Sequence, residues 1–450
     1  MKKRNLISVV CVSLAISYSS AQNPLLRGYA DPHMRVFDGK MYISVGKDLS
    51  PERKGFTMPY WEIYSSSDLK TWNSEVVINP ETTYLPKERH NNCWATDIVR
   101  RNDKYYFYFS NGGKEMGMMM ADAPNGPYKD PLNKPFIPED FSDNHEYDPT
   151  IFIDDNGEYY VIYGRDGGLN GKILHYQIAR LSQDMLSLAD APKDLITDQK
   201  YGFGGVNRAR DHQYFHKYNG LYYLSCGNMY MTSDNIYGPY TNPRSCGPTG
   251  HASFCCYNGQ WYHMYEYTCM PYGNRIYRQV SMTYLHYKDN GDMVSDPNFV
   301  QSYKASMPNG RYYHTGVANY SSRWSEIESE WFFKSSGSLK KRECPIGGFE
   351  MQNIHNNDYL VFPCVTYMNE NMQISFNISS GADTCSKIEI RDSKPDGKLL
   401  GICDISSTGS WTVYKDFTCV LDNTPGTNNL CFVFKGGRGE LMRFDKFSLK

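Results

Sequence analysis

Short polar turns that open onto aromatic stretches recur along the first two thirds of the chain. The pattern occurs five times, at residues 38–42, 102–106, 156–160, 219–223 and 258–262, and each copy ends in Tyr. Asn-Gly and Asp-Gly pairs favour hairpin turns, because both turn residues tolerate positive φ. Unequal, blade-sized lengths of chain separate the copies. They predict five sheets closed in a ring, a five-bladed β-propeller, with a polar well where the inner strands converge.

The hydrophobic pattern changes at about residue 324. Apolar and polar residues alternate over short stretches such as 373–378 and 387–391, and Gly-containing turns separate these stretches. Alternation of this kind predicts half-buried strands, and no long stretch of the mature chain has helical periodicity. We therefore expect an all-β protein, with the propeller over residues 22–318 and a β-sandwich of the jelly-roll type over 324–450.

The first residues have the pattern of an export signal. A basic start at 1–4 precedes an apolar run at 6–16 and a small-residue cleavage context at 19–21. We expect residues 1–21 to be a signal peptide and the mature protein to be secreted or periplasmic. Of the 13 cysteines, those after Cys11 number six in each domain, which permits disulfides in an exported protein without predicting their pairing.

The formal net charge of -2 makes nucleic acid and membrane poor candidate partners, and we expect a monomer. Three acidic positions, each a few residues upstream of a repeated turn, are the candidates for catalytic chemistry: Asp31, Asp148 and Asp211. Glycoside cleavage needs one carboxyl to protonate the leaving oxygen and another to take a proton from water or attack directly. A third charge nearby can raise the pKa of the acid. The alternative is that the Asp residues only start turns.

Residues 23 to 290 resemble glycoside hydrolase family 43. The motifs that carry the resemblance are Ala30-Asp31-Pro32-His33, Trp94-Ala95-Thr96-Asp97-Ile98, residues 148–157, residues 216–225 and Gly250-His251-Ala252-Ser253. The resemblance implies a five-bladed propeller that hydrolyses by inversion. It also implies that Asp31 is the general base, and that Asp148 tunes the pKa of the acid and orients the sugar.

The third acidic position departs from the family pattern. The family usually has Glu six residues before the Lys of this strand, which is Lys217 here, whereas this chain has Asp211. The shorter side chain withdraws the carboxyl by about 1.5 Å, and a misplacement of that order can cost about a hundredfold in rate. Three hypotheses remain open: Asp211 is the acid with a shifted backbone, His212 replaces it, or the propeller only binds sugar.

The propeller also contains candidate binding residues. Trp94 is expected to stack on a sugar ring, and Asp97, in the same motif, is a candidate for a further substrate contact. Arg278 is a candidate for contact with a sugar hydroxyl or with the acid residue, and the alternative is a surface Arg. His251 is implied to help hold a hydrated calcium ion on the propeller axis, and the alternative is a buried His bonded to a backbone carbonyl. No cofactor is expected for the chemistry itself. The loops at 48–60 and 270–275 are expected to narrow one end of the well.

Residues 324–450 resemble a family 6 carbohydrate-binding module, on motifs at 326–330, 357–360, 407–411, 434–437 and 444–447. The resemblance implies a sugar cleft at Tyr414, where the family commonly has Trp, and a structural calcium at Glu328 and Asp445. Arg443 stands where the family has a sugar-binding Asn. The alternative for Glu328 and Asp445 is a pair of surface carboxylates.

The expected function is that of an inverting glycosidase acting on plant or algal polysaccharide of xylan, arabinoxylan, arabinan or galactan type. By resemblance, β-xylosidase or α-L-arabinofuranosidase activity is favoured. The alternative is a lectin-like protein that has lost turnover.

Overall fold

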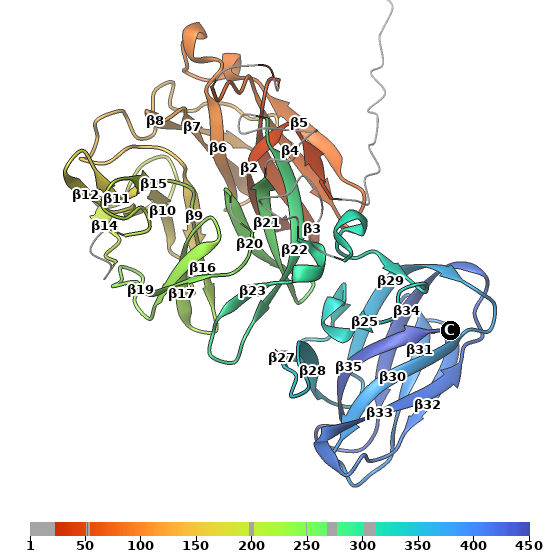
Figure 1. Cartoon of the computed structure of the whole chain (residues 1–450). Helices are drawn as coiled ribbons and strands as arrows, with labels where there is room; N and C mark the ends of the chain where they lie inside the picture. The colour runs from red at the N-terminus through yellow and green to blue at the C-terminus, as the bar shows by residue number, and fades with distance from the viewer. Residues whose placement is uncertain are drawn as a thin grey trace, which may run out of the picture.

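The computed structural model describes residues 23–50, 52, 55–197, 202–248, 250–267, 277–300 and 311–450, so the expected signal peptide lies outside it. Within these residues all regular structure is β-sheet apart from five 3₁₀ turns. None of the helical segments in this part of the chain is long and apolar enough to cross a membrane. Figure 1 shows two bodies, a ring of sheets coloured red to green and a sandwich coloured cyan to blue. The all-β expectation is confirmed.

Five antiparallel sheets make up the ring. The first contains β2 (Tyr29–Phe37), β3 (Lys40–Lys47), β4 (Trp61–Ser66) and β5 (Asn73–Ile78), and the second β6 (Cys93–Arg101), β7 (Lys104–Asn111) and β8 (Glu115–Ala121). The third contains β9 (Thr150–Ile153), β10 (Tyr159–Tyr163), β13 (Gln177–Arg180) and β14 (Lys193–Asp194). The fourth contains β16 (Gln213–Tyr218), β17 (Leu221–Cys226), β18 (Met229–Ser233) and β19 (Thr241–Ser245). The fifth contains β20 (Ala252–Tyr257), β21 (Gln260–Tyr267), β22 (Gln279–Tyr287), β23 (Met293–Ser295) and β1 (Leu26–Arg27). A small sheet of β11 (Asp166–Leu169), β12 (Lys172–Leu174) and β15 (Ala209–Arg210) lies beside the third and fourth.

The five sheets close into a propeller through their first strands. Each inner strand contacts the next around the ring, in the order β2, β6, β9, β16, β20 and back to β2. The N-terminal strand β1 pairs with β22, with Leu26 opposite Val280, so the beginning of the described chain completes the last blade. Closure of this kind leaves the inner strands facing a common axis.

The five repeated turns are the hairpins between the inner and second strand of each blade. Asp38, Asn102, Asn219 and Asn258 have φ between 48° and 54° at these turns. Positive φ suits the tight turns that match the twist of paired strands. The hairpin prediction is therefore confirmed at all five positions, because it depended only on local backbone chemistry.

The C-terminal domain is a sandwich of two sheets. One runs β24 (Tyr320–Ser321), β29 (Tyr359–Met368), β34 (Gly426–Lys435), β31 (Ser386–Asp392) and β32 (Leu399–Ile405), with β26 (Lys334–Ser335) paired to β29. The other runs β27 (Lys340–Glu343), β28 (Phe349–Ile354), β35 (Met442–Leu449), β30 (Gln373–Ser380) and β33 (Ser410–Val420), with β25 (Ile327–Glu328) paired to β35. The apolar residues of the alternating stretches, among them Ile374, Phe376 and Ile388, are buried between the sheets.

The two domains share an apolar interface. Tyr284 and Phe299 of the propeller side belong to one buried cluster with Trp331 and Phe362 of the sandwich side. The indole of Trp331 donates a hydrogen bond to the carboxylate of Asp296 across this interface. Segments β25, β27 and β28 lie at the junction (Figure 1).

Candidate active site

The predicted catalytic residues stand where inner strands begin. Asp31 lies in β2 at a register shift between Ala30 and His33, and Asp148 lies two residues before β9. Asp211 and His212 directly precede β16. Asp31, Asp148 and His212 have φ of 54°, 56° and 70°. A left-handed backbone at a non-glycine residue costs about 1–3 kcal/mol and is found where function requires a fixed geometry.

The ring brings these residues into one electrostatic group. Asp148 interacts with the charges of Asp31, Asp211 and His212, although they come from different blades. His251, which directly precedes β20, interacts with Asp148 and Asp31 as well. The start of an inner strand in each of four blades therefore supplies a group to the same site.

Asp31 is a buried carboxylate held in its ionised form. Its Oδ1 lies 3.0 Å from Nη1 of Arg278 and 3.3 Å from Nδ1 of His251. Its backbone N–H donates to Oε2 of Glu266 at 3.1 Å. Burial raises the pKa of Asp31, but the charges of Arg278 and His251 outweigh burial and hold the pKa below its ordinary value. An ionised carboxylate in this position can take a proton from water.

Arg278 neutralises three buried carboxylates. Besides Asp31, it donates from Nη1 to Glu266 at 3.3 Å, from Nη2 to Asp48 at 2.9 Å and from its backbone N–H to Asp48 at 2.6 Å. The predicted substrate residue Arg278 is thus a direct partner of the predicted base. Asp48 and Glu266 carry no motif in the sequence, and only the approach of β3, β21 and β22 places them here.

We expect Arg278→Met to destabilise the propeller strongly. Removing this cation deprives three buried carboxylates of a shared ion-pair partner, which costs about 3–5 kcal/mol. Urea unfolding followed by tryptophan fluorescence measures this loss. Arg100→Met is the matched control, because Arg100 pairs with the exposed residues Asp38 and Asp103 and its loss should cost at most about 1 kcal/mol. Equal effects of the two substitutions would contradict the role given to Arg278.

Asp148 is also buried, but its pKa is shifted upward, in the direction opposite to that of Asp31. Burial raises its pKa to about 7, and repulsion from Asp211 and Asp31 adds to the rise against the opposing effect of His251 and His212. Its Oδ2 accepts the backbone N–H of His212 at 3.3 Å. Its own backbone N–H donates to Oγ of Ser110 at 2.8 Å. Asp148 therefore positions the backbone at His212, and its protonation state depends on the charges of Asp31, Asp211, His212 and His251.

Asp211 and His212 form a close ion pair. Oδ1 of Asp211 lies 2.5 Å from Nε2 of His212, and its Oδ2 accepts the hydroxyl of Tyr147 at 2.7 Å. Nη2 of Arg165 lies 3.6 Å from the same Oδ2. Burial lowers the pKa of His212, but Asp211 raises it to about 10, while His212 and the other donors lower the pKa of Asp211. The proton of this pair therefore resides on the imidazole.

Tyr147 and Arg165 are site residues that the sequence analysis missed. Tyr147 directly precedes Asp148, so its position next to a predicted site residue could have identified it. Arg165 lies in a loop after β10, and no sequence motif marks it. Trp94 is half-buried and its ring lies 6.4 Å from that of Tyr147, so it borders the site. Its indole donates to the carbonyl of Phe56 at 3.1 Å.

Asp97 lies in the ring, but it has no exposed surface. Its carboxylate accepts Nε of Arg35 at 2.9 Å and the backbone N–H of Ile151 at 2.7 Å, and lies 3.6 Å from Nδ1 of His33. These contacts join β2, β6 and β9. In this arrangement Asp97 holds inner strands together and presents no oxygen to a substrate.

His251 is buried with a protein partner at each ring nitrogen. Nδ1 faces Asp31, and Nε2 lies 3.3 Å from Nε2 of His33. Across the described residues no three His, Cys, Asp or Glu side chains are grouped as a metal site. The ring of His251 therefore has no nitrogen available for the ion that the resemblance implies. Residues 270–275, expected to narrow the well, lie outside the described residues.

Tyr414 lies in β33 of the sandwich and is not part of the propeller site. Its hydroxyl donates to Oε2 of Glu350 at 2.7 Å. The neighbouring ring of Trp411 packs against Gly381 and has the guanidinium of Arg443 at 5.4 Å from its centroid. Arg443, the departure from the family pattern, therefore lies beside the ring of Trp411, three residues before Tyr414, where the resemblance places the sugar cleft.

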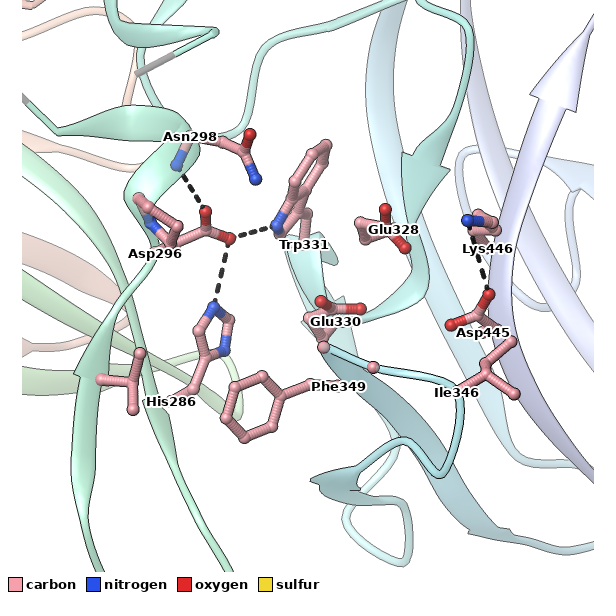
Figure 2. Close-up of a pocket in the computed structure, with 14 residues that line it drawn as sticks. His286, Asp296, Asn298, Glu328, Glu330, Trp331, Ile346, Phe349, Asp445 and Lys446 are labelled. Atoms are coloured by element: carbon pink, nitrogen blue, oxygen red, sulfur yellow. Dashed lines mark hydrogen bonds and ion pairs between the residues drawn. The ribbon is translucent and has the colours of Figure 1, made fainter. Parts of the chain in front are cut away.

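Glu328 and Asp445 line a cavity of about 400 Å³ at the domain junction. Figure 2 shows their carboxylates and that of Glu330 around the same space, with Asp296 and His286 of the propeller side opposite. Oδ2 of Asp445 and Oε2 of Glu330 are buried without a hydrogen bond among the described residues, although Nζ of Lys446 lies 3.8 Å from Asp445. Burial and the charge of Asp445 raise the pKa of Glu328 to about 8. These are not surface carboxylates.

Comparisons with known proteins match both domains to known families. The family model of glycosyl hydrolases family 43 matches residues 21–293, and that of the carbohydrate binding module (family 6) matches residues 328–450. An arabinoxylan arabinofuranohydrolase of Paenibacillus polymyxa is 25% identical over 94% of this chain and 73% of its own. A xylosidase/arabinosidase of Bacteroides ovatus is 28% identical over 59% of this chain and 94% of its own.

A solved structure shows the same two-domain fold. It is a family 43 arabinoxylan arabinofuranohydrolase from Bacillus subtilis in complex with cellotetraose. It covers 97% of this chain and 99% of its own, with 22% identity and a TM-score of 0.54. The likeness supports the propeller followed by the sandwich.

Proposed function

Because the chain belongs to glycosyl hydrolases family 43, we propose that this glycosidase releases arabinofuranosyl side groups from arabinoxylan with inversion at the anomeric carbon. The observation that carries the proposal is the site itself. An ionised Asp31 and a protonated His212 with its partner Asp211 are gathered around Asp148 on the axis of one propeller. Inverting hydrolysis needs such a base and such a proton donor on opposite sides of one glycosidic bond.

The choice of substrate rests on relatives. The relatives named arabinoxylan arabinofuranohydrolase and beta-xylosidase support a glycosidase acting on a xylan-type substrate. The finer choice of arabinofuranosyl groups follows the Paenibacillus polymyxa relative, which aligns with both domains of this chain. Export to the cell exterior or periplasm, where such polymers are met, is proposed from the N-terminal pattern.

The depth of the groups in the site assigns their roles. The side chains of His212 and Asp211 are 38% and 23% exposed, whereas that of Asp31 is 7% exposed. The polymer that leaves must lie toward solvent, so its oxygen receives a proton from the outer pair. Asp31, which is deeper, removes a proton from the water that attacks the sugar.

Within the outer pair, His212 is the proton donor and Asp211 positions it. Asp211 accepts hydrogen bonds from His212 and Tyr147, contacts Arg165 and is ionised. The imidazolium uses Nε2 for Asp211, and its Nδ1 is buried without a hydrogen-bond partner among the described residues. A turn of the ring toward the well would bring the Nδ1 proton to the leaving oxygen. His212 therefore replaces the Glu that the family usually has at the preceding position.

A product assay on the full chain tests the proposal. The enzyme is incubated with arabinoxylan, unsubstituted xylo-oligosaccharides, arabinan and galactan, and released monosaccharides are separated by chromatography. We expect free arabinose from arabinoxylan, and proton NMR at early times should show the anomer opposite to that of the substrate. Xylose released from unsubstituted oligosaccharides alone would instead identify a β-xylosidase. Binding of polysaccharide without any release would identify a lectin-like protein.

We further propose that Glu328 and Asp445 supply two of the ligands of a calcium site in the cavity of Figure 2. Calcium prefers carboxylate and carbonyl oxygens, and Oδ2 of Asp445 is buried without a hydrogen bond among the described residues. A bound cation would offset the burial and the repulsion from Asp445 that together raise the pKa of Glu328. Its role is structural, because the cavity is at the domain junction and not at the propeller carboxylates.

We expect calcium to raise the melting temperature of the chelator-treated protein at neutral pH. A hundredfold excess over the dissociation constant stabilises by about 2.7 kcal/mol, which corresponds to roughly 3 °C for a protein of this size. Glu328→Gln should lose the shift, and Glu370→Gln, at an exposed position, should retain it. An equal calcium response in both variants, or none in the wild-type protein, would rule out this site.

A further inference from the structure

Two cysteines of the sandwich, Cys403 and Cys419, lie on the edge strands of its two sheets. β32 is the edge strand of one sheet and carries Cys403, and β33 is the edge strand of the other and carries Cys419. The two strands contact each other although they belong to different sheets. All eleven described cysteines are free thiols in this structure, and Cys11 and Cys269 lie outside the described residues.

The strand contact sets the two cysteines opposite each other. The backbone N–H of Asp422 donates to the carbonyl of Leu400 at 2.6 Å, which fixes the register at one end. A Cβ on Gly401 would lie 3.1 Å from Cδ2 of Leu421, so the next position along is a close pair as well. Two further steps along each strand lead to Cys403 and Cys419.

Both thiols also point to the same side. Cys403 is paired across its sheet with Ile388, and Cys419 with Ile374, and both isoleucines are fully buried between the sheets. Directly opposed residues on paired strands share a face. Cys403 accordingly belongs to the buried cluster, and Cys419 packs against it. A Cβ on Gly401 would lie 3.8 Å from Sγ of Cys419, so this sulfur is directed toward β32.

We propose that Cys403 and Cys419 form a disulfide that cross-links the two sheets of the sandwich at their edge strands β32 and β33. A disulfide needs Cα atoms about 4.4–6.8 Å apart with their Cβ bonds directed toward each other, which is the arrangement of opposed residues on adjoining strands. No strand-to-strand hydrogen-bond ladder joins β32 to β33 in the described sheets, so the bond would add a connection that the fold otherwise lacks at this edge.

The oxidation is a thiol–disulfide exchange with an external disulfide such as oxidised glutathione. Cys419 is partly exposed, and its hydrogen bond from Cys403 lowers its pKa, so its thiolate attacks first and releases one glutathione thiolate. Sγ of Cys403 then attacks Sγ of Cys419 in the mixed disulfide, and the second glutathione leaves. Two electrons pass from the cysteines to the oxidant, and the two thiol protons end on the two glutathione molecules.

Peptide mapping of the intact chain tests the proposal. The folded protein is treated with oxidised glutathione, remaining thiols are alkylated, and peptides are analysed by mass spectrometry with and without reduction. We expect one peptide pair joined through Cys403 and Cys419 that separates on reduction. Recovery of both cysteines in alkylated form, or joined to other cysteines, would overturn the proposal. Because the wild-type chain is used, this result does not depend on the folding of a variant.

A stability measurement provides the second readout. The cross-link closes a loop of 15 intervening residues, and we expect oxidation to raise the melting temperature of the sandwich by roughly 10 °C. Cys419→Ser should abolish this shift, whereas Cys385→Ser, at an exposed position, should retain it. A shift that persists in Cys419→Ser would assign the oxidative effect to other cysteines and overturn the proposal.

Discussion

Asp31→Asn should lower kcat on arabinoxylan by about 10²–10⁴, the usual contribution of a general base. The amide keeps the size of the side chain but cannot take a proton from water. Arg278 and His251 remain beside it, so the substitution removes charge from the reacting group and leaves its surroundings in place. The measurement is the rate of arabinose release at saturating substrate.

The matched control for this substitution is Asp38→Asn. Asp38 lies at the hairpin that follows the same strand, and its side chain is 70% exposed. Its activity should equal that of the wild-type protein. Near-UV circular dichroism on both variants separates loss of chemistry from loss of fold. A fully active, folded Asp31→Asn protein would remove Asp31 from the mechanism.

His212→Gln should reduce hydrolysis of arabinoxylan by a similar factor, about 10²–10⁴. An aryl arabinofuranoside with a good leaving group needs little protonation, so the same variant should keep much of its activity on that substrate. The comparison of the two substrates isolates proton donation from binding. His355→Gln, on the surface of the sandwich, is the control and should leave both rates unchanged.

The pH dependence distinguishes His212 from Asp211 as the donor. The reaction needs His212 protonated, so the rate should fall as the pH rises through its pKa of about 10. Asp211 is a principal cause of that raised pKa. Asp211→Asn should therefore move the alkaline limb of the rate profile to lower pH while activity persists below it. Activity abolished at every pH would make Asp211 the acid instead.

The features that sequence reasoning predicted are those that depend on local chemistry. The Asn-Gly and Asp-Gly turns became hairpins because positive φ is a property of the two turn residues alone. The positions of Asp31, Asp148 and Asp211 near the turns followed from the same repeat, and the ring brought them together because inner strands share one axis. The catalytic roles came from resemblance to a family and not from spacing.

The features that sequence reasoning missed depend on contacts between distant segments. Arg278 meets Asp48 and Glu266 only where β3, β21 and β22 converge, and nothing near these residues in the sequence marks the contact. Asp97 is the opposite case, a residue that a motif marks although its side chain does not face the site. It stands in a motif shared with Trp94, but its side chain turns toward Arg35 between the strands while Trp94 borders the site. Motif membership did not specify which face each residue presents.

Chemical rescue tests the central claim most directly. Asp31→Gly opens space beside the anomeric carbon, and sodium azide can then attack an activated aryl arabinofuranoside in place of the water that Asp31 activates. If Asp31 is the base of an inverting reaction, azide should restore turnover and yield an arabinofuranosyl azide of inverted configuration. Absence of rescue in a folded variant, or an azide product of retained configuration, would contradict the mechanism.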